Sequence, residues 1–381
     1  MAKSTRSPPT QTTRPWRWGL FLSAVTTIVI ALLVVQFDTL DTAPYPSHEL
    51  AKKPIFVLPQ TNPRLLHGSE KIGEGQLLGP EDIVYDPKLR LIYTSCGDGW
   101  IKRVTVDDSV VEDWVNTGGR PLGLALGYSG EVYVADAFKG ILKITKDGEI
   151  EALTREAEGV KFGTSNGVAA AKNGVVYFTD ASWKYDLHNF MFDILEGRPY
   201  GRFMSYDPST KETKVIARDL YCANGVEMSP DQNFVIFCES VMLRCNRYYI
   251  QGEKVGSIDV FIDRLPGMPD NIRYDGDGHY WIAIPTELTF GWDIVRKYPY
   301  IWKLFVFLDK YLRRPSMERN AGVVVVDLDG KPIGRYYDPE LNYVTAGIKI
   351  GEHLYLGNLL KSFIMRLNLT QYPATATSST K

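Results

Sequence analysis

The sequence predicts an all-β protein, a six-bladed β-propeller preceded by a single transmembrane helix. Three observations support this prediction: a strand phrase that recurs six times, many aromatic and glycine residues, and one uncharged apolar stretch near the N-terminus. Of the 381 residues, 44% are hydrophobic and 23% are charged, so we expect a globular body rather than a disordered chain. The formal net charge is -2, whereas a nucleic-acid-binding protein carries a basic surplus, so we expect no nucleic-acid partner.

The first 37 residues have the pattern of a membrane anchor. Residues 1–18 form a basic leader without acidic residues, and residues 19–37 carry no charge. A spanning helix needs about 20 apolar residues, and Lys and Arg before it predict a cytoplasmic N-terminus. We therefore expect a single-pass type II membrane protein of the secretory pathway that contacts the lipid bilayer through residues 19–37. A cleaved signal peptide is the alternative, although its apolar core is usually shorter.

The part after the anchor carries two features of the secretory pathway, beyond a linker predicted at residues 38–59. Asn368 begins an Asn-Leu-Thr triplet, which is an acceptor for glycosylation. The chain has four cysteines. A disulfide between Cys222 and Cys238 is the pairing we favour, because both residues are expected on adjacent strands of one sheet. Four free thiols are the alternative, since sequence alone does not choose a pairing.

The repeated phrase extends over residues 60–370. It reads IYTSC, VYVAD, VYFTD, VIFCE, YWIAI and LYLGN, and its anchors are Tyr93, Tyr133, Tyr177, Ile236, Tyr280 and Tyr355. The gaps between anchors are 40, 44, 59, 44 and 75 residues, so the basal period lies in the forties and two gaps hold insertions. This period matches four-stranded blades around a central channel. A two-layer sandwich would explain the strands but not their sixfold repeat.

The longer insertion, residues 285–319, combines aromatic residues with Lys and Arg. Read as a helix, this segment gathers five apolar residues near one face: Trp302, Leu304, Phe305, Leu308 and Leu312. Three interpretations stay open: a lid over the channel, a second contact with the bilayer surface, or a helix packed on a blade edge. Residues 371–381 are expected to form a flexible tail.

The candidate site lies where the innermost strands begin, because these strands line the channel and start at equivalent positions. Counting back from the anchors, four of the six blades place a carboxylate or an amide there: Glu81, Asn166, Asn224, Asp270 and Asn271. Oxygen donors without His or Cys suit Ca²⁺, which takes about 6–8 oxygen ligands. The alternative is that Asn166-Gly167 and Asn224-Gly225 are ordinary hairpin turns.

Several segments carry a more specific resemblance. The phrases GPEDIVYD, RPLGL, YVADAFKGI, ANGVEMSPD and LPGMPDNIR resemble the strictosidine synthase-like family, and they are most similar to its branch of the adipocyte plasma membrane-associated protein and plant relatives. That branch is itself similar to paraoxonase-type propellers. The resemblance implies a six-bladed propeller whose calcium ion is held by the five residues named above. Plant relatives imply the endoplasmic reticulum, the vacuole or the cell surface.

The sequence also departs from these relatives. Thr345 stands where strictosidine synthase has a catalytic glutamate, so we do not expect the alkaloid-forming condensation. The histidine pair of the paraoxonases has no counterpart, and His188 and His279 are expected to be surface or structural residues.

The function that we expect is hydrolysis of an ester, lactone or phosphotriester, that is, of a small-molecule substrate. Ca²⁺ would polarise the reacting oxygen, Asp270 would act as nucleophile or as base on a water, and Glu81 would be mainly a ligand. Two alternatives are a non-enzymatic propeller that binds a ligand or partner with structural calcium, and a true strictosidine synthase.

Overall fold

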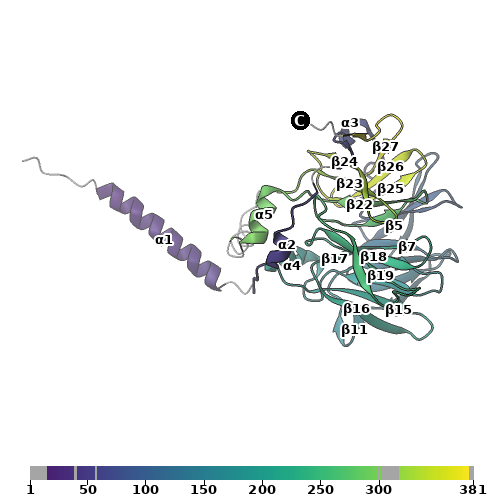
Figure 1. The fold of residues 1–381 in the computed structure, drawn as a ribbon, viewed down its shortest axis with the longest axis horizontal. Helices are drawn as coiled ribbons and strands as arrows, with labels where there is room; N and C mark the ends of the chain where they lie inside the picture. Colours follow the sequence, from purple (N-terminus) through teal and green to yellow (C-terminus); the bar gives the residue numbers. More distant parts are fainter. Residues whose placement is uncertain (1–14, 38–40, 56–57, 299–300, 302–316, 377–381) are drawn as a thin grey trace, which may run out of the picture.

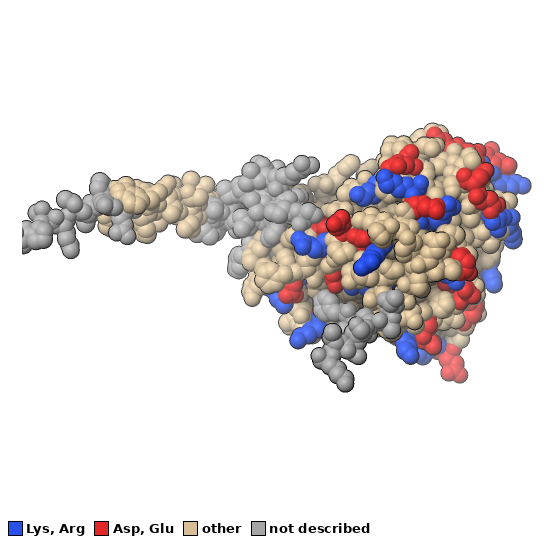
Figure 2. Space-filling model, turned by 90° about the horizontal axis from the view of Figure 1, so that it is seen from above, with Lys and Arg blue, Asp and Glu red and all other residues tan. Residues whose placement is uncertain are grey.

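The computed structural model describes residues 15–37, 41–55, 58–298, 301 and 317–376. Six blades of mainly antiparallel strands confirm the predicted propeller, and Figure 1 shows them packed in one body. Each anchor of the repeated phrase lies on the second strand of its blade and is buried. On the face seen in Figure 2, basic and acidic side chains are interspersed, as the near-neutral charge leads one to expect.

The first four blades each hold four consecutive strands, counted from the channel outwards. Blade one contains β3 (Ile83–Asp86), β4 (Leu91–Ser95), β5 (Trp100–Thr105) and β6 (Val111–Asn116). Blade two contains β7 (Pro121–Leu126), β8 (Val132–Asp136), β9 (Gly140–Ile144) and β10 (Ile150–Thr154). Blade three contains β13 (Ser165–Ala170), β14 (Val176–Asp180), β15 (Gly201–Asp207) and β16 (Glu212–Leu220). Blade four contains β17 (Ala223–Met228), β18 (Phe234–Glu239), β19 (Arg244–Tyr249) and β20 (Ile258–Ile262).

The last two blades take strands from both ends of the chain, and this closes the ring. Blade five contains β21 (Ile272–Tyr274), β22 (His279–Ile284), β23 (Ala321–Asp327) and β24 (Pro332–Asp338), extended by β1 (Gln60–Asn62) and β28 (Thr375–Ala376). Blade six contains β25 (Val344–Ile350), β26 (His353–Asn358) and β27 (Ile364–Asn368), and its outer strand is β2 (Ser69–Ile72). A short hairpin, β11 (Glu156–Ala157) and β12 (Val160–Lys161), lies outside the blades.

The apolar core lies between neighbouring blades rather than in one central mass. Tyr93 packs in one cluster with Leu124 and Val134 of the second blade. At the other end of the sequence, Tyr355 packs in one cluster with Ile83 of the first blade. The ring is therefore closed by side-chain burial as well as by the strands from the two chain ends.

A buried guanidinium occupies the middle of the channel. Arg273 of β21 forms an ion pair with Asp82, and the two residues are 4% and 0% exposed. Its other N–H groups donate to carbonyl oxygens of Ile83, Leu124 and Val226, at 3.2, 3.0 and 3.3 Å. One side chain thus links the innermost strands of four blades.

Helices complete the described part. They are α1 (Pro15–Phe37), α2 (Ser47–Leu50), α3 (Leu65–Gly68), the 3₁₀ turn η1 (Leu187–Asn189), α4 (Phe190–Glu196) and α5 (Phe290–Lys297). Within the residues that the structure describes, no helix combines the length and apolar character needed to cross a membrane. The transmembrane segment at residues 19–37 stays a prediction.

The disulfide predicted between Cys222 and Cys238 is wrong. The structure joins Cys238 to Cys245, which lies directly opposite on the neighbouring strand β19. Cys222 instead precedes β17 and lies opposite Ser240, whose N–H donates to the Cys222 carbonyl at 3.1 Å. Cys222 thus adjoins the strand next to that of Cys238, but a register difference of two residues separates the two side chains.

Candidate functional site

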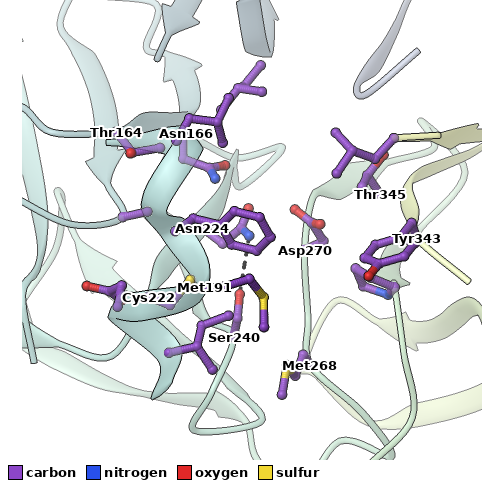
Figure 3. Close-up of a pocket in the computed structure, with 18 of the residues that line it drawn as sticks. Thr164, Asn166, Met191, Cys222, Asn224, Ser240, Met268, Asp270, Tyr343 and Thr345 are labelled. Atoms are coloured by element: carbon purple, nitrogen blue, oxygen red, sulfur yellow. Dashed lines mark hydrogen bonds between the residues drawn. The ribbon is translucent and has the colours of Figure 1, made fainter. Parts of the chain in front are cut away.

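The innermost strands begin around a cavity at one end of the channel. The cavity has a volume of about 140 Å³, and Glu81, Asn166, Asn224 and Asp270 line it. In Figure 3, Asn166 and Asn224 face Asp270 across this space. Asn271 adjoins the cavity, and its Nδ2 donates to Glu81 Oε1 at 3.0 Å. The structure therefore brings together the five residues that spacing selects.

Each of these five residues keeps a buried oxygen that has no hydrogen-bond partner among the described residues. The atoms are Glu81 Oε2 and the Oδ1 atoms of Asn166, Asn224, Asp270 and Asn271. Leaving a buried acceptor unsatisfied costs about 1–3 kcal/mol, so such atoms are rare and need an explanation. A ring of unsatisfied oxygens fits a hard cation such as Ca²⁺.

The chemistry of the donors also fits calcium better than a transition metal. Among the described residues there is no cluster of three or more His, Cys, Asp or Glu side chains that could hold a metal ion. Three of the five residues in the oxygen ring are asparagines, and the other two are acids. Amide and carboxylate oxygens are typical calcium ligands, whereas zinc prefers nitrogen and sulfur.

Hydrogen bonds hold the amide nitrogens of Asn224 and Asn271. Asn224 Nδ2 donates to Ser240 Oγ at 3.2 Å, the dashed contact in Figure 3. Ser240 Oγ in turn donates to the carbonyl of Pro269 at 2.7 Å. The Oδ1 atoms of Asn224 and Asn271 are left without a partner among the described residues. The partner of the Asn271 nitrogen is Glu81, a residue of the ring itself.

Strand irregularities place the asparagines. The register of β13 shifts across residues 166–167, and that of β17 shifts across residues 224–225. Such bulges re-aim a side chain and are common near active sites. The glycines are needed for space: a Cβ on Gly167 would lie 2.6 Å from the Asn224 carbonyl oxygen, and one on Gly225 would lie 2.4 Å from the Asp270 carbonyl oxygen. The Asn-Gly pairs are therefore points where neighbouring blades approach, and the hairpin-turn interpretation is wrong.

The two acids of the ring are destabilised as anions. Burial raises the pKa of Asp270 to about 8. Burial also raises the pKa of Glu81 well above its usual value, and the nearby Asp270 and Asp82 carboxylates raise it further. Arg120 opposes this rise but does not cancel it. A bound cation would supply the missing positive charge.

Thr345 takes the equivalent position in the sixth blade. Its Oγ1 donates to the Glu81 carbonyl at 2.6 Å, and its own carbonyl accepts from the Asn271 N–H at 3.1 Å. Thr345 therefore positions two residues of the ring, and it offers no acid to the cavity.

The walls of the cavity are mostly apolar and come from segments outside the blades. Helix α4 and the turn before it contribute Leu187, Phe190, Met191 and Ile194, and α5 contributes Trp292. A wall of this kind excludes water and strengthens electrostatic interactions within the site.

One buried acid within this apolar wall was missed by sequence reasoning. Asp193 of α4 lines the cavity and is 4% exposed. Burial raises its pKa to about 7, and a side-chain hydrogen bond from Ser182 opposes the rise. Asp193 lies in the 59-residue gap between two anchors, which the repeat pattern marks only as an insertion. The signal in the sequence is one acid in an apolar run, FMFDIL.

The segment after α1 holds α4 in place. The Asp41 N–H donates to Glu196 Oε1 at 2.9 Å, and the Tyr45 hydroxyl donates to the Ile194 carbonyl at 2.6 Å. The Ala43 N–H donates to the Glu196 carbonyl at 2.8 Å. Residues 41–55, most of the predicted linker, are therefore called the strap below.

The predicted insertion at residues 285–319 is described only in part. Pro285, Thr286, Trp292 and Glu318 line the cavity. The five apolar residues expected on one helical face, Trp302, Leu304, Phe305, Leu308 and Leu312, lie outside the described residues.

Three other predicted residues lie away from the cavity. His188 is exposed and stacks on Phe138, with ring centroids 5.1 Å apart. The His279 ring lies 3.3 Å from an Asp275 carboxylate oxygen. Asn368 ends β27, and its Oδ1 accepts from the Thr370 N–H at 2.9 Å. Glycosylation of Asn368 stays a prediction.

Solved structures of low sequence identity share this fold. A gluconolactonase from Xanthomonas campestris matches with a TM-score of 0.57 and 16% identity, covering 84% of this chain and 99% of that one. A calcium-binding regucalcin from Agrobacterium tumefaciens matches with a TM-score of 0.57 and 15% identity, covering 81% of this chain and 95% of that one.

Sequence comparisons give a closer relationship. The strictosidine synthase model matches residues 166–253, and the strictosidine synthase-like N-terminal model matches residues 60–104. The chicken (Gallus gallus) adipocyte plasma membrane-associated protein is 33% identical, over 80% of this chain and 79% of its own. Strictosidine synthase-like protein 6 of Arabidopsis thaliana is 52% identical, over 93% of this chain and 96% of its own. The chain therefore belongs to the strictosidine synthase-like family.

Proposed function

We propose that this protein is a calcium-dependent hydrolase of apolar esters or lactones. The observation that carries the proposal is the ring of five buried oxygens without partners beside a mostly apolar cavity. A propeller named as a calcium-binding regucalcin and another named as a gluconolactonase share the fold, which agrees with this choice of ion and reaction.

The residues of the ring have different roles in the proposed reaction. Bound Ca²⁺ would polarise the substrate carbonyl. Glu81, Asp270 and the amide oxygens of Asn166, Asn224 and Asn271 would hold the ion. Asp270 faces the cavity and takes a proton from the attacking water, because a carboxylate there can act as a general base. Thr345 keeps Glu81 and Asn271 in register through its two hydrogen bonds.

The apolar residues that line the cavity determine which substrates we expect it to bind. Phe190, Met191, Ile194, Met268 and Trp292 surround the space beside the ring. Burying a charged group against them would be unfavourable without a partner, whereas an alkyl or aryl chain gains from leaving water. We therefore expect esters or lactones with an apolar acyl or alcohol part.

In this proposal, the predicted transmembrane segment at residues 19–37 brings the cavity close to a membrane. If residues 19–37 span the bilayer, Asp41, which is bound to Glu196 of α4, follows only four positions after the end of α1 at Phe37. Four positions along the chain reach at most about 14 Å. The cavity wall would then lie next to the bilayer surface, where apolar substrates concentrate. Carbonate extraction tests the anchor, since a spanning protein stays in the membrane pellet and release into the supernatant would contradict it.

The full chain in detergent micelles tests the proposed function. Calorimetry should detect Ca²⁺ binding, and a panel of alkyl esters and lactones should be hydrolysed with loss of activity on chelation. Asp270→Asn should abolish turnover. Asp275→Asn is the matched control, because Asp275 lies in the same blade but accepts from Trp281 Nε1 at 3.0 Å outside the cavity.

Two results would decide against the proposal. Turnover that survives both chelation and Asp270→Asn would exclude the oxygen ring as the reacting site. Calcium binding without turnover of any ester or lactone would leave a calcium-binding propeller that holds a ligand or partner.

A further inference from the structure

Asp193 lines the cavity from a different element than the oxygen ring. The ring belongs to the propeller strands and their loops, whereas Asp193 belongs to the inserted helix α4. The Cys222 thiol lies within electrostatic reach of both groups: after burial, the Asp193 and Asp270 carboxylates are the main causes that raise its pKa. The two acids therefore line one cavity from different elements.

The hydrogen bonds of Asp193 leave one oxygen for a ligand. Its Oδ1 is buried and has no partner among the described residues. Ser182 Oγ already accepts from the N–H groups of Lys184 and Tyr185, at 3.3 and 3.1 Å. The Ser182 hydroxyl proton is therefore left to donate to the Asp193 carboxyl, in the side-chain hydrogen bond that joins the two residues. A proton carried by Asp193 then resides on the remaining oxygen, which is Oδ1.

We propose that Asp193 is a second catalytic residue of this cavity, the general acid that protonates the departing alkoxide oxygen of an ester or lactone. This assignment rests on the proposed function. Asp193 has the three features that the role needs: a buried carboxyl, a free oxygen on the cavity and a fixed position. The strap supplies the last of these, because the Tyr45 hydroxyl holds the carbonyl of the next residue, Ile194, at 2.6 Å.

The surroundings of Asp193 favour its protonated form. Burial is the main cause that raises the pKa of Asp193, and the Glu196 and Asp180 carboxylates raise it further. Lys184 lowers it, but Lys184 is itself bound to Glu196 at 2.6 Å. Tyr45 and Cys222 also face the carboxyl, and the pKa of each is raised, so both are neutral at pH 7.

The proposed step balances without a further reactant. Water attacks the carbonyl carbon, one of its protons passes to Asp270, and a tetrahedral intermediate forms. The bond between the carbonyl carbon and the leaving oxygen then breaks as that oxygen takes the proton from Asp193 Oδ1. The products are the carboxylic acid and the alcohol, joined in one molecule when the substrate is a lactone. Net transfer of the proton from Asp270 back to Asp193 through solvent restores the site.

The dependence on the leaving group tests the role of Asp193. Ethyl hexanoate and para-nitrophenyl hexanoate share an acyl group, but only ethoxide needs a proton to leave, because para-nitrophenolate is a stable anion. Asp193→Asn in the full chain should lower kcat/KM for the ethyl ester about 10²–10⁴-fold, the usual contribution of a general acid. For the para-nitrophenyl ester, kcat/KM should fall less than about threefold, because its leaving group departs without taking up a proton.

Leu195→Ala is the matched control. Leu195 is buried on the same helix, carries no charge and does not line the cavity. Its loss should change the rates of both esters by the same factor. If Asp193→Asn does not fold, the wild type still tests the role, because protonation of the leaving group makes kcat/KM nearly independent of the alcohol across a series of hexanoate esters.

The outcomes separate this inference from the proposed function. Equal loss for the two esters in Asp193→Asn, or no loss, overturns the role of Asp193. A wild-type rate that falls steeply as the alcohol becomes a poorer leaving group overturns it as well. Hydrolysis that needs Asp270 but not Asp193 leaves the proposed function standing. Failure of the wild type to hydrolyse either ester overturns both.

Discussion

Removing Arg273 should destabilise the propeller more than removing any surface ion pair. In Arg273→Met, Asp82 would stay in the channel as a buried carboxylate without its cation, since both residues are almost fully buried. Breaking a buried pair by removing one partner costs about 3–5 kcal/mol. The carbonyls of Ile83, Leu124 and Val226 would lose donors as well. This is a large share of a stability that is typically about 5–15 kcal/mol.

Thermal and urea unfolding of the full chain measure this loss. For a domain of this size, about 1 kcal/mol corresponds to roughly 2 °C, so Arg273→Met should lower the Tm by roughly 6–10 °C. Adding Asp82→Asn should recover part of the loss, because the double variant no longer holds an uncompensated charge. Arg335→Met is the control: Arg335 is also buried, but its nearest carboxylate oxygen, on Glu287, lies 3.5 Å away.

Either of two results would contradict this prediction. A loss below about 1 kcal/mol would show that the channel rehydrates and that the guanidinium does not hold the inner strands together. Strictly additive effects of Arg273→Met and Asp82→Asn would show that the two side chains are not energetically coupled.

Three further predictions concern the site. Ca²⁺ at about 100 times its Kd should stabilise the chain by about 2.7 kcal/mol, and Asp270→Asn should reduce this shift in Tm; no shift in the wild type would contradict the ion site. Gly225→Ala should lower calcium affinity, because the added Cβ would lie 2.4 Å from the Asp270 carbonyl oxygen. Gly334→Ala is the control, because its Cβ would have no atom nearer than 3.9 Å; equal calcium affinities of the two variants in calorimetry would refute this prediction. At saturating Ca²⁺, where the bound cation would keep Asp270 ionised, kcat/KM for the ethyl ester should decline as pH rises above 7, because a general acid must be protonated and the pKa of Asp193 is about 7; a rising profile would count against it.

The sequence predicts the propeller and the oxygen ring for the same physical reason, which is repetition. Equivalent strands start at equivalent heights in the channel, so a count back from Tyr177 or Ile236 finds Asn166 or Asn224 without a structure. The count also reaches Glu81 and Asp270, although both lie in loops before short strands. Repetition does not explain why glycine follows the two asparagines. Gly167 and Gly225 are needed because a Cβ there would meet the backbone of the neighbouring blade, and not because of a turn in their own strand.

Features outside the repeat could not be predicted in this way. The disulfide depends on register: Cys238 is opposite Cys245, and a difference of two residues along the strand pair of β17 and β18 removes Cys222 from reach. Asp193 lies in an insertion between the second and third strands of blade three, and among the described blades only blade five has a helix, α5, at the same place. The strap, over residues 41–55, is short, and only its partners on α4 distinguish it from a linker.

These differences indicate where chemistry can change within one fold. The ring is fixed by the inner strands, and the bulges that aim its asparagines cannot shift without moving the neighbouring blade. The last blade, where Thr345 stands, contributes a hydroxyl that is already used to hold Glu81. Helix α4 is free of both constraints, because it is inserted between β14 and β15 and is held by the strap. If Asp193 is the general acid proposed above, α4 supplies the acid that the last blade lacks, and the residue at position 345 alone does not decide whether such a propeller catalyses a reaction.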